Sequence, residues 1–260
     1  MSEYLFDNQS EQERRRLDLL QQIFDPITRE HLERIALPPD ARCLDFGAGA
    51  GSVARWLCDR VGPDGRVVAT DLDTVFLERL TEKNLDVRRH DILTDDLEEK
   101  TFDLIHSRLV LDFFPERRHE VVERLVSALR PGGWLVLEDF DWSTLTAVSP
   151  GPRSDVVGRF HGALPAVFPS GAPELGRSLP LTFRAAGLSD VGADGRVHVG
   201  LGGTPAARWW QLSVLALRPR IVELGLFSGA EVDEYLQAID DDGLSFLPVM
   251  VTAWGRRPAV

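Results

Sequence analysis

The chain is poor in cysteine and in long apolar runs, and each scarcity excludes a class of protein. Its two cysteines, Cys43 and Cys58, are not spaced as a CxxC pair, so neither a disulfide scaffold nor a structural zinc site is expected. A reducing, cytoplasmic environment suits such a chain. No stretch approaches the roughly 18 apolar residues that a membrane span requires. The polar segment at residues 1–16 lacks the apolar core of a signal peptide.

The chain also lacks a net positive charge, because acidic residues outnumber basic ones: the formal net charge is −12 and the isoelectric point is near 5.0. Proteins that bind nucleic acid usually present a basic face, since neutralising phosphates supplies much of their affinity. Here the arginines are scattered or interleaved with acids, as in EQERRR and FPERRHE. Nucleic acid is therefore not expected as a partner. The sequence leaves the oligomeric state open, a homodimer included.

Short apolar runs alternate with amphipathic segments in the first half of the chain. Strands are expected at residues 43–46, 66–71, 85–91, within 101–114 and at 134–142, and helices at 52–61, 74–84 and 115–130. Strands that alternate with helices predict an α/β fold, with a mostly parallel sheet flanked by helices on both faces.

The segments on either side of this region predict covering elements. A helical pattern at residues 11–36 contains Pro26, which is expected to break it into two helices. The expected divisions are an N-terminal helical lid (1–38), a core (39–145), a substrate-lid insertion (146–186) and a C-terminal part of the core (187–260), with a helical insertion at about 204–242.

The strongest local motif is the run Leu44–Gly51, LDFGAGAG, between the first expected strand and the first helix. Glycines let a backbone adopt positive φ and approach a ligand closely, and the helix that follows presents free N–H groups. The spacing is GxGxG followed by Ser52, whereas the dinucleotide fingerprint is GxGxxG. A tight turn without a ligand is the alternative interpretation.

Asp71 ends the second expected strand, 20 residues after Gly51. A carboxylate at this position of a βαβ unit accepts hydrogen bonds from ribose hydroxyls. An acid that only caps the next helix is the alternative, and the nearby glycine run favours the nucleoside interpretation.

Four motifs in order, LDFGAGAG, ATDLD, RRHDI and LRPGGWLVLEDFD, span roughly residues 40–140. This set resembles the class I S-adenosylmethionine (SAM)-dependent methyltransferases, and its style is close to the ubiquinone/menaquinone-type and secondary-metabolite small-molecule branches. The resemblance implies a Rossmann-like, seven-stranded sheet and transfer of a methyl group to a small molecule. The signatures of the adenine-targeting and cytosine C5 DNA enzymes of the family are absent.

The resemblance also implies cofactor contacts. The methionine part would lie along Asp45, Gly47, Ala48, Gly49 and Gly51. Asp71 would bind the ribose, Leu72 and Ile92 would pack on the adenine, and Asp91 would bind the adenine amino group. Ser107 would lie on the sulfonium side. On the N-terminal helix and before it, Tyr4, Arg15 and Gln22 are further candidates, with a solvated helix face as the alternative.

Candidate catalytic groups follow the fourth and fifth strands, where ligands bind in open α/β sheets. The first choices are His106, Arg108 and Asp139, and the other acids nearby are Asp112, Glu138 and Asp141. His106 could equally be a structural residue of the sheet. Asp112, Asp139 and Asp141 could together hold a divalent cation, but no metal motif is recognised and no metal is expected.

Aromatic and apolar residues in the expected covering elements form either a helix core or the wall of a pocket, and as a lid they would favour a flat or apolar acceptor. They are Trp142, Phe160, His161, Phe168, Trp209, Trp210 and Leu215. Two alternatives to a methyltransferase stay open: a SAM-binding protein that does not methylate, and an NAD(P)-dependent oxidoreductase. The second is disfavoured because Tyr4, Tyr235, Lys83 and Lys100 form no Tyr-xxx-Lys pair.

Overall fold

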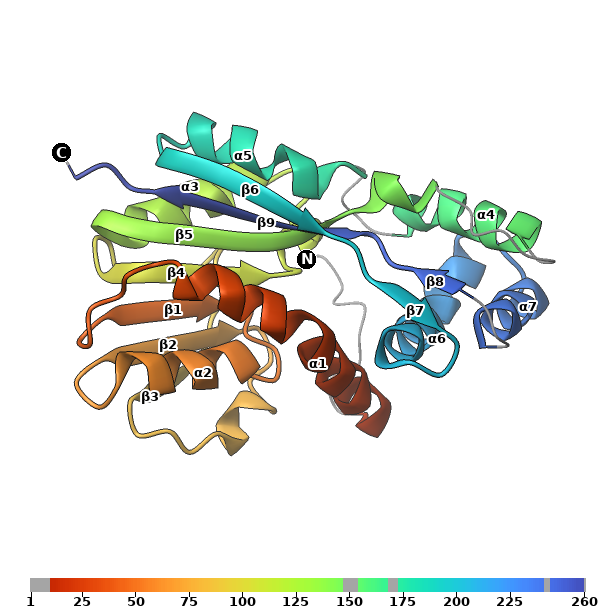
Figure 1. The fold of residues 1–260 in the computed structure, drawn as a ribbon, viewed down its shortest axis with the longest axis horizontal. Helices are drawn as coiled ribbons and strands as arrows, with labels where there is room; N and C mark the ends of the chain where they lie inside the picture. Colours follow the sequence, from red (N-terminus) through yellow and green to blue (C-terminus); the bar gives the residue numbers. More distant parts are fainter. Residues whose placement is uncertain (1–9, 147–153, 168–172, 241–243, 260) are drawn as a thin grey trace.

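The computed structural model describes residues 10–146, 154–167, 173–240 and 244–259 (Figure 1). Its central feature is a seven-stranded sheet in the order β3-β2-β1-β4-β5-β9-β6. The strands are β1 (Arg42–Phe46), β2 (Arg66–Asp71), β3 (Leu85–Arg89), β4 (Phe102–Arg108), β5 (Leu129–Asp141), β6 (Ser189–Arg196) and β9 (Val249–Arg256). Neighbours among β1 to β5 pair in parallel, and β9 runs antiparallel between β5 and β6. The expected mostly parallel, seven-stranded sheet is confirmed.

Helices cover both faces of this sheet (Figure 1). On one face lie α1 (Glu11–Glu33) and α2 (Ser52–Val61), and on the other lie α3 (Arg118–Ala128) and α5 (Leu175–Ala185). The inner strands β1 and β4 are buried along almost their whole length, as expected for a parallel sheet covered on both faces. The strand order reverses direction between β1 and β4, so the carboxyl ends of these two strands flank a ligand-binding crevice.

Helix α1 continues through Pro26, so the predicted break at this residue is wrong. Ser10 caps the start of the helix, because its hydroxyl accepts a hydrogen bond from the N–H of Glu13 at 3.0 Å. Pro26 lies on the exposed side, while Ile23, Phe24 and Ile27 are buried. Tertiary packing of that apolar face compensates for the backbone hydrogen bond that proline cannot donate.

The expected helix at residues 74–84 is also wrong, because only a single 3₁₀ turn, η1 (Leu77–Arg79), forms there. Within residues 74–84 only Phe76 and Leu77 are buried. A surface helix needs an apolar stripe along several turns, and two buried side chains do not supply one.

A second group of elements lies beside the sheet (Figure 1). It comprises α4 (Ser154–Ala163), α6 (Pro205–Glu223), α7 (Gly229–Asp240) and the two-stranded pair β7 (Val199–Leu201) and β8 (Leu244–Phe246). Side chains of α4, α6 and α7 share one apolar cluster with Leu20 and Phe24 of α1. The expected insertion at 146–186 therefore has two parts, because α4 packs on α7 whereas α5 packs on β5 and β9.

Within the described ranges, no helix has both the length and the apolar character that crossing a bilayer requires.

Candidate functional site

The glycine turn lies at the carboxyl end of β1, where its backbone forms one wall of a cavity. Gly49 has φ +56°, and a Cβ added to it would meet only Leu17 Cδ2, at 3.9 Å. The Gly49 backbone therefore faces open space. Gly51 also has positive φ, but its Cβ would come within 2.5 Å of Leu80 Cδ1. Gly51 does not line the cavity and instead allows close packing against the segment that follows β2.

Asp71 ends β2 opposite this turn. Its Oδ2 accepts a hydrogen bond from the N–H of Gly49 at 2.8 Å, and its Oδ1 accepts one from the N–H of Asp73 at 3.2 Å. Burial raises the pKa of the Asp71 carboxyl, although the backbone hydrogen bonds oppose that shift. A carboxylate oxygen accepts more than one hydrogen bond, so this group retains capacity for a ligand hydroxyl. Leu72 follows at the rim, with 46% of its surface exposed.

The segment after β3 supplies the next part of the wall. Asp91 and Ile92 both line the cavity, and the Asp91 side chain accepts a hydrogen bond from the N–H of Leu93 at 2.9 Å. Ile92 is 1% exposed. The buried ring of His90 also lines the cavity, and neither of its nitrogens has a partner in the described part of the chain.

These elements enclose a single cavity of about 590 Å³. Its volume lies within the range of about 300–1,000 Å³ that is typical of small-molecule sites. One end contains the glycine turn, Asp71 and Asp91, and the other is walled by aromatic residues of η3 (Trp142–Thr146) and α6. The α1 helix borders it through Arg16, Leu17, Leu20 and Gln21.

Several sequence-predicted residues lie elsewhere. Arg15 and Gln22 are exposed on α1, whereas Arg16 and Gln21 reach the cavity. Neighbouring residues on a helix point about 100° apart, so only one of Gln21 and Gln22 can lie near a given face. Leu17 and Leu20 mark the buried face of α1, and this was the sequence signal that favours Gln21. Tyr4 lies outside the described residues. Ser107 does not line the cavity. Its hydroxyl instead donates a hydrogen bond to the carbonyl of Phe46 at 2.7 Å.

The His106 ring lies in a buried charge network beneath the cavity. Its Nδ1 is 2.8 Å from Oδ1 of Asp45, and its Nε2 is 3.4 Å from Oε2 of Glu138. Glu138 also accepts hydrogen bonds from the hydroxyls of Thr28 and Thr252. Burial would lower the pKa of His106, but hydrogen bonds to the two carboxylates outweigh it and raise the pKa to about 9. The ring is therefore protonated at neutral pH, with both nitrogens engaged.

Glu138 titrates in the opposite direction. Burial would raise its pKa, but the hydrogen bond and the charge of His106, together with the nearby Arg108, lower it to about 2. The ionised forms of His106 and Glu138 therefore stabilise each other.

Arg108 joins this network to the covering helix. Its guanidinium donates to Thr28 Oγ1 at 2.9 Å and to Asp25 Oδ1 at 3.0 Å, both on α1. Asp25 Oδ1 also accepts a hydrogen bond from the Ser52 hydroxyl at 3.0 Å. The side chains of Arg108 and Asp25 are 8% and 9% exposed. Sequence reasoning missed Asp25 and Thr28, because partners 80 or more residues away leave no local signal.

Asp139 does not line the cavity. Its carboxyl accepts hydrogen bonds from the N–H groups of Leu111 and Phe140, at 3.2 and 3.1 Å. Burial, followed by the nearby charge of Asp112, raises its pKa well above the ordinary value. Asp141 pairs with Arg177 instead. Within the described ranges, no three His, Cys, Asp or Glu side chains lie close enough together to hold a metal ion.

The aromatic and apolar residues expected above the sheet, where the structure describes them, divide into three groups. Trp142, Trp209 and Trp210 line the cavity. Phe160 and His161 are buried behind it, next to Tyr235, and Leu215 is exposed. Phe168 lies outside the described residues.

Comparison with known proteins finds a known domain in this chain. Residues 44–135 match the family described as "Methyltransferase domain". A curated relative, methyltransferase str2 of Strobilurus tenacellus, is 31% identical over 129 residues, which are 49% of this chain and 46% of that protein. The matching region thus spans about half the length of this relative.

Two solved structures share the fold. Phosphoethanolamine N-methyltransferase 2 of Haemonchus contortus, in complex with phosphomonomethylethanolamine and S-adenosylhomocysteine, has a TM-score of 0.52 at 18% identity, covering 94% of this chain and 52% of that one. The [4+2]-cyclase SpnF has a TM-score of 0.56 at 17% identity, covering 92% of this chain and 83% of that one.

The ordered motifs, the strand order and the matched domain define a Rossmann-like nucleoside-binding α/β protein of the methyltransferase class. Residues 44–135 carry the match to the methyltransferase domain, and the fold is that of the class I SAM-dependent methyltransferases, whose methyl donor is SAM. A shared domain and fold indicate the cofactor more firmly than the acceptor, so the acceptor has to be argued from the cavity itself.

Proposed function

We propose that this protein transfers a methyl group from SAM to a small organic acceptor, of the kind that secondary metabolism supplies. The observation that carries the proposal is the single cavity, which runs from the glycine turn and Asp71 to an aromatic end. A cofactor and an acceptor that share one cavity are within reach of each other, as transfer requires.

The residues at the first end fit the proposed cofactor. Gly47, Ala48 and Gly49 would hold its amino-acid part through the backbone, where the Gly49 backbone faces open space. Asp71 would accept hydrogen bonds from the ribose hydroxyls, and Leu72 and Ile92 would flank the adenine. Asp91 would accept a hydrogen bond from the adenine amino group. When bound, SAM supplies an electrophilic methyl group on a sulfonium.

The buried network suits orientation and exclusion of water better than proton abstraction. His106 is protonated at neutral pH and both of its nitrogens face carboxylates, so we assign it a positioning role. Arg108 connects the sheet to Asp25 and Thr28 and thereby holds α1 along the cavity. Near-attack positioning contributes roughly 7–11 kcal/mol in favourable reactions, and a cavity that holds cofactor and acceptor together would act through this effect.

Two measurements test the proposal. Calorimetry should detect binding of SAM and S-adenosylhomocysteine, and thermal shifts with NAD(P) should be absent. Labelled SAM should then donate its methyl group to at least one member of a panel of neutral aromatic, acidic and amine acceptors. Binding without transfer to any acceptor would favour a SAM-binding protein that does not methylate, and no binding at all would refute the proposal.

A further inference from the structure

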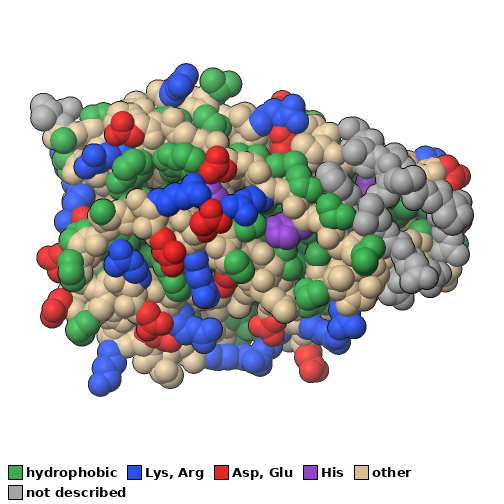
Figure 2. Space-filling model, viewed as in Figure 1, with side chains coloured by type: hydrophobic (Ala, Val, Ile, Leu, Met, Phe, Trp, Pro, Cys, Tyr) green, Lys and Arg blue, Asp and Glu red, His purple; other side chains and the backbone are tan. Residues whose placement is uncertain are grey.

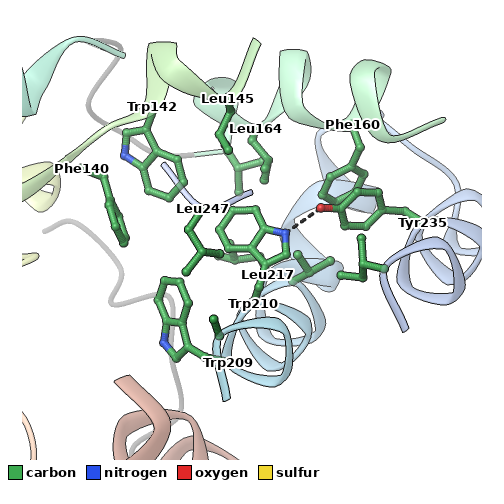
Figure 3. Close-up of a cluster of buried hydrophobic side chains, with 14 of the residues drawn as sticks. Phe140, Trp142, Leu145, Phe160, Leu164, Trp209, Trp210, Leu217, Tyr235 and Leu247 are labelled. Carbon is green, nitrogen blue, oxygen red and sulfur yellow. Dashed lines mark hydrogen bonds between the residues drawn. The ribbon is translucent and has the colours of Figure 1, made fainter. Parts of the chain in front are cut away.

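The aromatic end of the cavity belongs to one buried apolar cluster, which Figure 3 shows. Its walls come from β5, η3, η4 (Leu164–Ala166) and α6, which lie far apart in the sequence. Six of the side chains that line this end are at most 5% exposed: Phe140, Trp142, Leu164, Trp209, Trp210 and Leu217. Walls of this kind favour an apolar ligand, because such a ligand leaves water without losing hydrogen bonds.

The polar groups that border this end face protein partners. Asp112 accepts a hydrogen bond from Trp142 Nε1 at 2.7 Å, and Arg108 pairs with Asp25. The Ser213 hydroxyl donates to a backbone carbonyl of α6 at 2.9 Å. Burying a charged ligand group without a counterion is strongly unfavourable, so the part of the acceptor that enters this end should be uncharged.

The backbone of Leu109, directly after β4, is strained. Its φ is +58°, in the left-handed region that costs free energy for a residue with a Cβ. The N–H of Leu109 is held there by a hydrogen bond to the carbonyl of Glu138 at 2.8 Å. Strain of this kind persists only where the surrounding structure imposes it, and it clusters at functional sites.

The strained turn sends three consecutive side chains to three different places. Arg108 binds two side chains of α1. Val110 packs on the glycine turn, because a Cβ added to Gly47 would collide with it. Leu109 packs against the apolar cluster of the aromatic end, lines the cavity and is only partly buried. Leu109 therefore lies where the glycine turn and the aromatic end meet, with part of its surface open to a ligand.

We infer that Leu109 is a specificity-determining residue, whose side chain closes the acceptor compartment on the side of the cofactor. The compartment takes an uncharged, apolar part of the acceptor against Trp142, Trp209 and Trp210, and the nucleophilic atom faces the glycine turn. This inference rests on the proposed function and names the class of acceptor that the same cavity takes.

Two probes of similar shape test the chemical class on protein loaded with S-adenosylhomocysteine. Equilibrium dialysis compares 4-(3-methylbutyl)phenol with 3-(4-hydroxyphenyl)propanoate, which replaces the branched apolar end by a carboxylate. We expect the neutral phenol to bind at least about 10-fold more tightly, because the carboxylate would lose its hydration without gaining a counterion. Equal binding, or tighter binding of the carboxylate, would overturn the inference.

A series of 4-alkylphenols, from methyl to hexyl, tests the role of Leu109. Wild-type affinity should rise about fourfold for each methylene that is buried and should level off once the compartment is full. Leu109→Ala shortens the side chain that closes the compartment, so the levelling should occur about two methylenes later. A purely structural role would lower stability without moving this limit, and an unchanged limit in the folded variant would overturn the inference.

Two further variants control for folding and for general loosening of the cluster. Leu19→Ala is the matched control, because Leu19 is partly buried against the same cluster but does not line the cavity; it should keep the wild-type limit. Leu109→Gly should shift the limit as Leu109→Ala does, but melt at a higher temperature, because glycine adopts positive φ without strain. The reverse order of melting temperatures would contradict the strained backbone from which the inference starts.

The measurements separate this inference from the proposed function. If S-adenosylhomocysteine fails to bind the wild-type protein, the proposed function fails and the inference fails with it. If S-adenosylhomocysteine binds but the length limit does not depend on Leu109, only the inference is overturned and the cofactor site stands.

Discussion

His106 Nδ1 lies 2.8 Å from Asp45 Oδ1, and this contact links the centre of β4 to the centre of β1 beneath the cavity. Both side chains are almost completely buried, at 1% and 4% exposure. A buried ion pair of this kind is strongly destabilising to break, because the remaining charge has no solvent to stabilise it. Replacing either residue of the pair should therefore lower the stability of the folded protein.

Replacing His106 should change the pH dependence of stability. The imidazole pKa is raised from 6.5 to about 9 on folding, so its stabilisation is complete below the unfolded value and is lost as pH rises through the folded value. His106→Gln should lower the free energy of unfolding by about 3–5 kcal/mol near pH 6 and flatten its decline between pH 6.5 and 9. Urea titrations at several pH values measure this.

The matched control for that experiment is His119→Gln, because His119 is exposed on α3. It should keep the wild-type pH profile. A wild-type profile in His106→Gln would contradict the assigned protonation of the ring.

Asp71→Ala should weaken SAM binding with little effect on folding. The lost carboxylate would have accepted charge-assisted hydrogen bonds from the ribose, and the loss of even one of them, worth about 1.5–3 kcal/mol, should lower the affinity at least roughly 10–100-fold. Isothermal calorimetry gives the dissociation constant. Asp73→Ala is the control, because Asp73 does not line the cavity; equal losses in both variants would place the ribose elsewhere.

Substitutions at the two glycines should separate binding from packing. Gly49→Val adds a side chain on the open, cavity-facing side of the turn and should cripple SAM binding. Gly51→Val forces a side chain against Leu77 and Leu80 and should mainly reduce stability, by about 1–3 kcal/mol or more, as overpacking does. Melting temperatures and calorimetry on both variants test this, and the reverse pattern would mean that the ligand lies against Gly51.

Asp25→Ala should loosen helix α1 over the cavity. It removes the carboxylate that Arg108 and Ser52 share and leaves the buried guanidinium without its acid, a change that costs about 3–5 kcal/mol in comparable sites. Hydrogen exchange should accelerate in the second half of α1. Asp18→Ala, at an exposed position of the same helix, should leave exchange unchanged, and identical exchange in both variants would refute the proposed link.

The space-filling view is consistent with the acidic composition. Blue and red side chains are interspersed on the face seen in Figure 2, and no broad basic area covers it. Surface ion pairs of the described residues include Arg34–Glu30 and Arg196–Glu30. Exposed pairs of this kind contribute little stability, so the buried network is the better target for the variants above.

The sequence by itself determined the features that depend on local order along the chain. The alternation of strands and helices set the parallel sheet, and the positions of Gly49 and Asp71 set which groups meet at its carboxyl edge. Periodicity and turn chemistry act over a few residues, so they are legible in one dimension. Two predictions made from local rules alone were wrong. At Pro26 the helix continues because its apolar face is packed, and at residues 74–84 only a 3₁₀ turn forms because too few side chains are buried.

Only the tertiary structure decided what the side chains of the site do. His106 became a protonated bridge because Asp45 and Glu138 approach it from neighbouring strands, 61 and 32 residues away. Gln21 rather than Gln22 reached the cavity because the docking of α1 chose one face. Among the described residues the Trp209 N–H has no partner, whereas Asp112 and Tyr235 accept hydrogen bonds from the other two indoles. Charge state and hydrogen bonding depend on neighbours in space, and those neighbours exist only once distant segments have packed together.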